Sequence, residues 1–388
     1  MRAPPAGKVA VVVLGDLARS PRMLNHAREL AANGFEVVLI GYRGLKFDPP
    51  AGVRVVALDG GRSAPPGRSG LHFALTAGLR MSRLFLALFS ALLREKPRTI
   101  LLQNPPSFPT LTASVLATKY IRAQIVVDWH NYGFSLLAVR LGADHWLVRL
   151  ARWYEFRAAR PASRHFCVSR AMCEDLRHHG IGAEVLYDRP LHFQPACTDS
   201  SARLTVVCPA GWTADEDIAL LLDALEQLPE TAITVFVTGD GPTRRELAPR
   251  LQSLRAKGIL VDTGFLPEDE YWKLIGRADL GLSLHRSSSG LDLAMKVVDL
   301  YSAGVPVGAL DYGGAIREQI EEDVTGFLFQ TAQDLARSLS LLASAPETLV
   351  PMRQAIAGRW SAASWSEEWK RIMLPALMTK PSRTNRGF

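Results

Sequence analysis

The chain reads, from residue 287 to 307, Ser287-Ser288-Ser289-Gly290-Leu291-Asp292-Leu293-Ala294-Met295-Lys296-Val297-Val298-Asp299-Leu300-Tyr301-Ser302-Ala303-Gly304-Val305-Pro306-Val307. An apolar strand, Leu280–His285, is predicted just before this stretch, and a helix is predicted to begin near Asp292. Small residues let backbone N–H groups approach a ligand, and a helix N-terminus binds phosphate well. With Lys296 in the first turn and Asp299 able to accept hydrogen bonds from sugar hydroxyls, the stretch predicts a pocket for a diphosphate and a ribose.

Strands and helices alternate on both sides of this stretch. The strands are apolar runs without alternation, which is typical of parallel strands covered by helices on both faces. We therefore expect an α/β protein with two Rossmann-like, doubly wound domains facing a central cleft. A chain of 388 residues also exceeds the usual size of a single core. The predicted parts are residues 1–195, residues 202–360 and a C-terminal helix over 361–380, with a linker at Leu191–Ala202.

Composition narrows the classes of partner. The net charge of +7 and the pI of about 9.4 favour an anionic partner. Nucleic acid is disfavoured because the basic residues are interleaved with apolar runs and lack exposed aromatic neighbours. The four cysteines form no CxxC pair, which indicates a reduced cytosolic protein without a zinc site. Arg80 and Arg83 interrupt the apolar stretch Leu71–Leu93, so an amphipathic helix is expected there instead of a membrane span.

Polar side chains follow several predicted strands, where parallel sheets place their ligands. Asp16 and Arg19 come after the first strand without a GxGxxG motif, so no dinucleotide fingerprint is present. Ser20 and Pro21 can instead begin a helix. The rigid loop that contains Asn104 follows the fourth strand and could bind sugar hydroxyls; the alternative is a simple turn.

The fifth predicted strand ends in Asp128-Trp129-His130-Asn131-Tyr132-Gly133. An acid and an imidazole at a strand end can take a proton from an attacking hydroxyl. Farther along, the acids of Gly211–Asp217 either hold a divalent metal or, as we favour, lie in a helix turn capped by Thr213. The turn at Gly239 and the segment Phe265-Leu266 could approach a nucleotide base.

At these positions the chain resembles the chitobiosyldiphosphodolichol β-mannosyltransferases, which have the GT-B fold. The similarity extends from Val9 to about Leu339. It is carried by Gly15–Met23, Gln103–Ser107, Asp128–Gly133, Tyr154-Glu155, Cys167–Met172, Trp212–Asp217 and Leu284–Asp299. The Glu-x7-Glu pattern of many GT-B enzymes is matched only at its second acid, Asp299, because the first position is Leu291.

The resemblance implies transfer of mannose from GDP-mannose to the outer GlcNAc of a polyprenyl-diphosphate-linked GlcNAc-GlcNAc, making a β-1,4 bond with inversion. It implies an acceptor site in the N-terminal domain and a donor site in the C-terminal domain. It also implies a peripheral location on the cytoplasmic face of the membrane. We expect a prokaryotic relative without the N-terminal anchor of eukaryotic members, and a membrane contact through Leu71–Arg98.

The expected roles follow from this resemblance and from the loops described above. The general base is expected to be Asp128 or His130, with Asp16 as the next candidate. The donor-binding residues are expected to be Arg19, Gly239, Phe265, Leu266, Ser289, Gly290, Leu291, Asp292, Lys296 and Asp299. The acceptor-binding residues are expected to be Asn104, Asn131 and Tyr132. No metal ion and no cofactor beyond the donor substrate is expected.

Three other functions fit the sequence less well. A second GT-B transferase could use another nucleotide sugar or lipid-linked acceptor in surface-polysaccharide synthesis. A sugar-nucleotide epimerase shares the two-domain architecture and would convert the donor without a lipid acceptor. A non-catalytic binding subunit is disfavoured because it would not require the acid and imidazole of Asp128–Gly133.

Overall fold

The computed structural model describes residues 7–44, 47–58, 70–195, 203–228, 233–361 and 363–378. Contacts divide them into two compact units. The first unit runs to Val168, includes Met172–Leu186 and resumes at Trp369; the second comprises Ser169–Ala171 and Tyr187–Glu368. The sequence placed the first domain's end later, at 195. Residues 196–202 of the predicted linker, 379–380 of the predicted C-terminal helix and the tail beyond lie outside the described residues.

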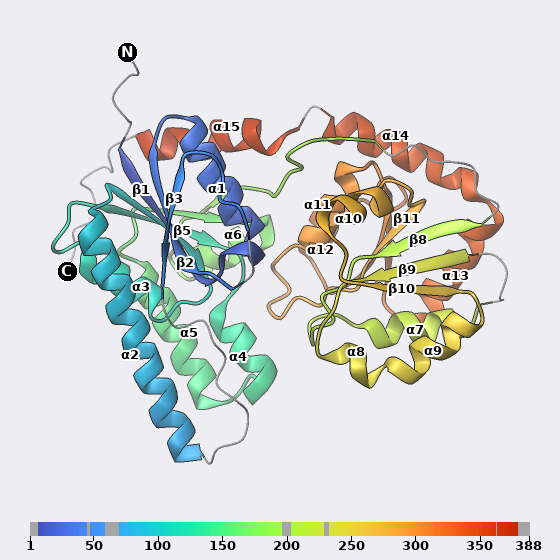
Figure 1. The fold of residues 1–388 in the computed structure, drawn as a ribbon, viewed down its shortest axis with the longest axis horizontal. Coiled ribbons are helices and arrows are strands. Elements are labelled where there is room, and N and C mark those ends of the chain that lie inside the picture. The colour runs from blue at the N-terminus through green and yellow to red at the C-terminus, as the bar shows by residue number, and fades with distance from the viewer. Residues whose placement is uncertain are drawn as a thin grey trace. The chain divides into compact units, whose positions relative to one another are not determined.

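The first unit is built on a parallel sheet in the order β3-β2-β1-β4-β5-β6-β7 (Figure 1). Its valine-rich strands are buried along nearly their whole length, because helices cover them. The elements are β1 (Lys8–Asp16), η1 (Leu17–Arg19), α1 (Pro21–Ala32), β2 (Glu36–Tyr42), β3 (Val53–Ala57), α2 (Gly70–Glu95), β4 (Thr99–Asn104), α3 (Thr110–Ala117), β5 (Gln124–Trp129), α4 (Gly133–Leu141), α5 (Trp146–Ala159), β6 (Arg164–Cys167), α6 (Arg170–His178) and β7 (Glu184–Val185).

The second unit is built on a parallel sheet in the order β10-β9-β8-β11-β12-β13. The elements are β8 (Leu204–Cys208), α7 (Ile218–Glu226), β9 (Ile233–Thr238), α8 (Thr243–Glu246), α9 (Ala248–Ala256), β10 (Leu260–Gly264), α10 (Glu268–Ile275), β11 (Leu280–Ser283), α11 (Met295–Ser302), β12 (Val307–Leu310), α12 (Ile316–Gln319), β13 (Gly326–Phe329), α13 (Ala332–Ser344), η2 (Pro346–Thr348), α14 (Leu349–Trp360) and α15 (Trp365–Met378), whose C-terminal part belongs to the first unit. The predicted pair of Rossmann-like α/β units is confirmed.

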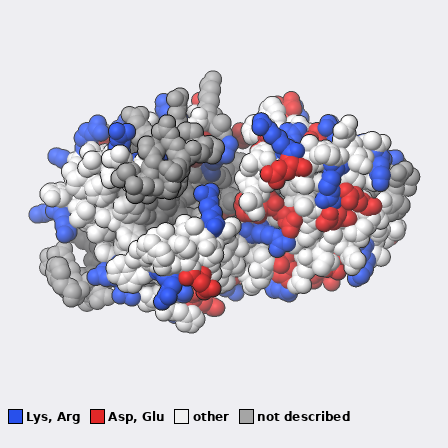
Figure 2. Space-filling model, turned by 90° about the horizontal axis from the view of Figure 1, so that it is seen from below, with Lys and Arg blue, Asp and Glu red and all other residues white. Residues whose placement is uncertain are grey.

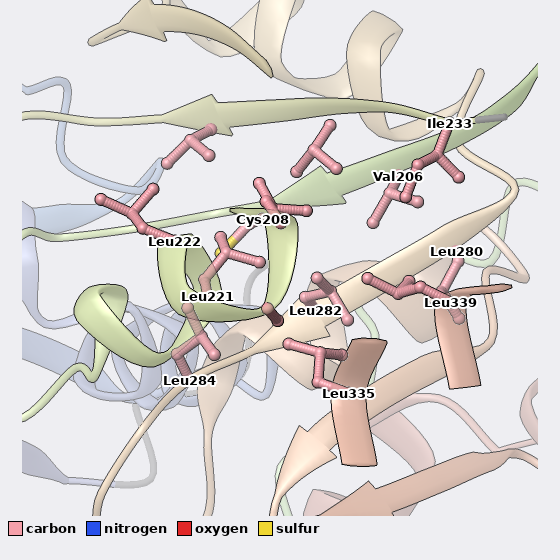
Figure 3. Close-up of a cluster of buried hydrophobic side chains, with 14 of the residues drawn as sticks. Val206, Cys208, Leu221, Leu222, Ile233, Leu280, Leu282, Leu284, Leu335 and Leu339 are labelled. Carbon is pink, nitrogen blue, oxygen red and sulfur yellow. The ribbon is translucent and has the colours of Figure 1, made fainter. Parts of the chain in front are cut away.

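Alternate residues of β8 serve two cores. Val206 and Cys208 join the cluster beneath α7, α9 and α13, whereas Val207 joins the cluster beneath α10, α11 and α14. Figure 3 shows Leu221 of α7 and Leu335 of α13 among the strand side chains of the first cluster. Helices therefore cover both faces of this sheet, as a doubly wound fold requires.

The amphipathic stretch predicted at Leu71–Leu93 forms most of α2. Its described residues bury Leu84, Leu88 and Leu92, whereas Leu79 and Leu86 are exposed. Within the described residues, no helix combines the length and the apolar character that a membrane crossing requires.

Candidate functional site

Each sheet has a point at which the strand order reverses, between β1 and β4 in the first unit and between β8 and β11 in the second. Ligands of doubly wound proteins bind beyond the carboxyl ends of the strands at such points. In the first unit, this position brings the loop after β1 beside the loop after β4. In the second, it brings the loop after β8 beside the loop after β11.

Asp128, on β5, lies at the centre of a buried polar cluster. Arg22 of α1 donates from Nε to Oδ2 and from Nη2 to Oδ1, both over 2.8 Å. His26, one turn farther along α1, has Nε2 at 3.0 Å from Oδ2. His130 has Nε2 at 2.7 Å from the same oxygen. The Asp128 carboxylate is fully buried, whereas the His130 side chain is 21% exposed, so the imidazole is the part of this pair that reaches solvent.

The tautomer of His26 follows from its hydrogen bond to Trp369. The indole Nε1 of Trp369, on α15, donates to His26 Nδ1 over 2.9 Å. An indole N–H cannot accept a hydrogen bond, so Nδ1 is the acceptor and the ring proton lies on Nε2. Burial lowers the pKa of His26, which keeps the ring neutral. His26 therefore donates to Asp128.

Asp128 is held as an anion. Burial by itself would raise the pKa of its carboxyl, but the charge of Arg22, followed by that of His130 and the hydrogen bonds of both, holds the pKa well below its usual value. Because both carboxylate oxygens are occupied, Asp128 is arranged to hold its neighbours in place and to stabilise positive charge on them.

The two candidates from the loop after β1 differ in exposure. Asp16 is half-buried, and its Oδ1 accepts a hydrogen bond from the Ala18 amide over 3.1 Å, which caps η1. Arg19 is exposed. The structure places both at the carboxyl end of β1, as predicted.

The predicted acceptor residues surround a buried acid that sequence reasoning did not assign. Glu155, on α5, accepts from the Asn104 side chain over 2.6 Å and from the amides of Gly133 and Phe134 over 2.9 and 3.1 Å. Burial raises the pKa of Glu155, and these hydrogen bonds oppose the rise. Glu155 thus ties the Asn104 loop to the first turn of α4.

Asn131 and Tyr132 stabilise the same turn. Asn131 Oδ1 accepts from the Tyr132 amide over 2.7 Å. The Tyr132 ring is 1% exposed, and its hydroxyl donates to Asp175 over 2.7 Å. The structure therefore places Tyr132 in the packing beneath the loop, and not on a surface that an acceptor sugar could reach.

In the second unit, the loop after β11 is organised around Asp292. Asp292 Oδ1 accepts from the Ser287 hydroxyl, and Oδ2 lies 2.8 Å from His285 Nε2. Ser287 Oγ in turn accepts from the Gly290 amide over 2.8 Å. Gly290 has φ +74°, a backbone conformation that favours glycine. Asp292 is 8% exposed, so it shapes this loop from within.

Helix α11 begins at Met295 with Ala294 as its N-cap residue, which is later than the predicted start near Asp292. Gln319 binds both backbone polar groups of Ala294, because its Oε1 accepts from the Ala294 N–H and its Nε2 donates to the Ala294 carbonyl. Asp292 hence precedes the helix, because its carboxylate bonds within the loop, whereas Lys296 lies in the first turn as predicted.

Lys296 pairs with Glu216, a residue of the loop after β8. The second oxygen of Glu216 accepts from the Gly211 amide over 2.6 Å. Burial lowers the pKa of Lys296. The pair spans the reversal point of the second sheet. The helix predicted near Asp215 begins instead at Ile218 with Asp217 as its cap, which leaves Glu216 in the loop and makes the predicted Thr213 cap wrong.

Asp299 lies one turn beyond Lys296 on α11. The hydroxyl of Tyr271 donates to its Oδ2 over 3.2 Å. Burial raises the pKa of Asp299 to about 6, although the Tyr271 hydrogen bond and the charge of Lys296 lower it. Asp299 is therefore positioned to accept hydrogen bonds from a ligand hydroxyl in a partly desolvated setting.

The remaining donor candidates lie in neighbouring loops. Gly239 has φ +85°, and a Cβ there would lie 1.7 Å from the Ala210 carbonyl oxygen, so only glycine allows the loops after β9 and β8 to pack. Phe265 is 78% exposed and Leu266 is half-buried at the end of β10. The carbonyl of Leu291 accepts from the Ser169 hydroxyl, and Ser289 Oγ accepts from the Leu291 amide over 3.2 Å.

Sequence reasoning missed Arg22, His26, Glu155 and Glu216 as members of these clusters. Arg22 and His26 are four positions apart on one helix and therefore share a face, which was the available signal. Among the described residues, no three His, Cys, Asp or Glu side chains converge as metal ligands would.

Comparisons with known proteins show which family this chain is similar to. Residues 20–187 match the model described as a glycosyl transferase 4-like domain, and residues 203–344 match glycosyl transferases group 1. Chitobiosyldiphosphodolichol beta-mannosyltransferase from Homo sapiens is 31% identical over 435 residues, covering 96% of this chain and 93% of the relative. The protein of that name from Arthroderma benhamiae is 36% identical over 312 residues and 70% of each chain.

Other similar proteins carry different names. UDP-glycosyltransferase TURAN from Arabidopsis thaliana is 30% identical over 96% of this chain and 97% of its own. Among solved structures, HepE of Anabaena in complex with UDP and glucose aligns with a TM-score of 0.69 at 16% identity, covering 95% of this chain and 99% of that one. Sucrose-phosphate synthase from Thermosynechococcus elongatus aligns with a TM-score of 0.71 at 14% identity, covering 95% of this chain and 98% of that one. These structures show the fold alone, and it is the GT-B fold.

Proposed function

We propose that this chain, which belongs to the chitobiosyldiphosphodolichol β-mannosyltransferase family of glycosyltransferases, moves mannose from GDP-mannose to a polyprenyl-diphosphate-linked GlcNAc-GlcNAc. The product carries a β-1,4 bond formed with inversion. The similarity to the human relative over 96% of the chain is the observation that carries this proposal. The Arg22–Asp128–His130 cluster and the Lys296–Glu216 pair supply groups suited to the two chemical demands of this reaction.

The first demand is a base for the acceptor hydroxyl. Of the three candidates, His130 fits best, because Asp128 already accepts hydrogen bonds on both oxygens and Asp16 caps η1. With Nε2 donating to Asp128, the lone pair of His130 lies on Nδ1. The acceptor oxygen attacks the anomeric carbon while the carbon–oxygen bond to the diphosphate breaks. The hydroxyl proton moves to His130, and the Asp128 anion stabilises the resulting imidazolium.

The second demand is stabilisation of the departing diphosphate. Lys296 and the first turn of α11 supply positive charge, and the Ser289–Gly290 turn supplies close backbone approach. Glu216 holds the Lys296 ammonium at this end of the sheet. Asp299 accepts hydrogen bonds from the ribose, and the exposed Phe265 ring packs against the base. In this arrangement Lys296 performs the neutralisation that a divalent metal performs in other transferases, so we propose metal-independent transfer.

Because the proposed acceptor is attached to a lipid, we propose that the protein works at the cytoplasmic face of a membrane, with which it associates peripherally. A second candidate function is transfer from another nucleotide sugar to a different lipid-linked acceptor. The Arabidopsis thaliana relative is named a UDP-glycosyltransferase, which favours this second candidate. The two candidates share the same site and differ in the base and sugar bound near Phe265.

The test is mass spectrometry of a reaction that contains the purified protein, GDP-mannose and a short-chain polyprenyl-diphosphate GlcNAc-GlcNAc, with and without EDTA. UDP-glucose, UDP-galactose and UDP-GlcNAc are offered in parallel. A gain of one hexose from GDP-mannose in both tubes, removed by β-mannosidase, is the expected result. A gain only from a UDP-sugar would favour the second candidate, and loss of activity in EDTA would contradict metal independence.

A further inference from the structure

Helix α5 presents one exposed stripe of large side chains. Its members recur at spacings of three or four residues, which places them on a single helical face. They are Trp146, Arg149, Leu150, Trp153, Arg157 and, just past the helix, Arg160. Trp146 and Trp153 are 65% and 64% exposed. Two indoles left this open to water on one face mark a surface that contacts something else.

The opposite face of α5 belongs to the fold. Val148, Phe156 and Ala159 are buried, so the helix is anchored independently of the stripe. The one carboxylate of α5, Glu155, also points inward and binds the first turn of α4. The exposed stripe is therefore composed of tryptophan, leucine and arginine without an acidic residue.

A cationic hollow of about 730 Å³ lies beside the stripe. Its lining includes Arg149, Arg152, Arg157 and Arg160, together with His178 and His179 from the end of α6. Arg152 Nη2 lies 3.0 Å from His179 Nε2. The His179 ring stacks on Phe156 at 3.9 Å between centroids. Such a hollow suits a phosphate-bearing headgroup.

The preceding helix has a similar composition on its exposed side. Leu136, Val139 and Arg140 of α4 are exposed, with Val139 at 66%, and Asp144 in the loop between the helices is the one exposed acid of the hairpin.

The two halves of the chain differ in charge. Residues 1–195 hold 26 Lys and Arg against 13 Asp and Glu, whereas residues 196–388 hold 19 Lys and Arg against 25 Asp and Glu. On the face drawn in Figure 2, both charge signs are interspersed over the second unit. Positive charge is thus concentrated in the unit that carries the stripe.

We propose that the exposed stripe of α5, with the adjoining exposed residues of α4, is the surface through which the protein lies on an anionic phospholipid bilayer. Helices at the membrane interface combine tryptophan and leucine with arginine, because indoles reach the headgroup boundary and arginines pair with phosphates. An acidic protein partner would complement the arginines but not the two open indoles. The sequence predicted membrane contact at Leu71–Arg98, whereas this proposal assigns it to α5.

The test uses the full chain and vesicle flotation, with vesicles of phosphatidylcholine alone or with about one third phosphatidylglycerol. The variant R149E/R157E reverses two stripe charges. The control R245E/K257E makes the same charge change on exposed residues of the second unit. Each arginine near an anionic surface strengthens binding roughly fivefold, so R149E/R157E should bind the anionic vesicles at least about 25-fold more weakly. The control should bind like the unaltered protein.

A second variant, W146S/W153S, tests the apolar part of the stripe. At high salt the arginine contribution is screened, and this variant should then lose most of the remaining binding. Unchanged binding by R149E/R157E, an equal loss in the control, or equal binding to neutral vesicles would overturn the proposal. This inference rests on the proposed function only in that a lipid-linked acceptor would require the protein to work at a membrane. Because flotation requires no sugar transfer, failure of the surface and failure of the transfer assay are separate results.

Discussion

The Arg22 guanidinium and the Asp128 carboxylate meet side by side in the interior of the first unit, joined by two hydrogen bonds of 2.8 Å. Arg22 also donates to the Leu186 carbonyl over 2.9 Å, where β7 leads out of the unit. A buried ion pair that loses one partner leaves an uncompensated charge in a low-dielectric setting. The pair therefore supports both the fold of this unit and the orientation of His130.

Replacing Arg22 by Ala should destabilise the first unit by roughly 3–5 kcal/mol, because Asp128 would then be a buried charge without its main partner. The matched control is R28A on the same helix, where the side chain is exposed and donates to Asn25. That change should stay within about 0.5 kcal/mol. Urea unfolding of both variants gives the comparison, and equal midpoints would contradict a structural role for the Arg22–Asp128 pair.

The His130→Gln change should lower the rate of sugar transfer by roughly 10²–10⁴, the usual contribution of a general base. The affinity for GDP should not change, because the groups proposed to bind the diphosphate and the ribose, Lys296 and Asp299, lie in the second unit. The exposed His192 provides a control, and H192Q should transfer sugar at the unaltered rate. The measurements are initial transfer rates and GDP titration calorimetry. A transfer rate in H130Q within a few-fold of the original would return the role to Asp16.

The sequence predicted the α/β architecture well, because the central strands of both sheets are continuous apolar runs that alternate along the chain with predicted helices. It predicted the cluster around Asp128 only in part. Arg22 lies 106 positions earlier in the chain, and no local pattern connects such distant residues. Lys296 was recognised as a first-turn cation, but its partner Glu216 was assigned to a helix turn, since the sequence does not show that α7 begins two residues later.

Lys296→Ala should weaken GDP binding by roughly tenfold to a hundredfold, because a charge-assisted contact to phosphate is worth about 1.5–3 kcal/mol. Glu216→Gln should have a smaller effect, since it keeps the contact to Gly211 but loses the charge that holds Lys296. The exposed Lys273 on α10 provides the control K273A. Calorimetric titration with GDP measures all three. If K296A and K273A bound GDP equally, Lys296 would not contact the diphosphate.

His285 makes the stability of the second unit depend on pH. Burial alone would lower its pKa, but the carboxylates of Asp215 and Asp292 raise the pKa of His285 to about 9. The unfolded chain binds this proton with a pKa near 6.5. The stabilisation is therefore complete below about pH 6.5 and is lost as the pH rises through 9. The difference between the folded and unfolded pKa values of His285 corresponds to a stabilisation on the order of 3 kcal/mol.

The variant H285N removes this titration and leaves the other groups of the unit in place. Urea midpoints of the second unit should fall for the unaltered protein between pH 6.5 and 9, while those of H285N should start lower and change much less. The exposed His192 again provides the control, because H192Q should follow the unaltered curve. Parallel curves for H285N and the unaltered protein would show that His285 is not held as a cation between Asp215 and Asp292. The loop from Ser287 to Asp292 would then require another source of order.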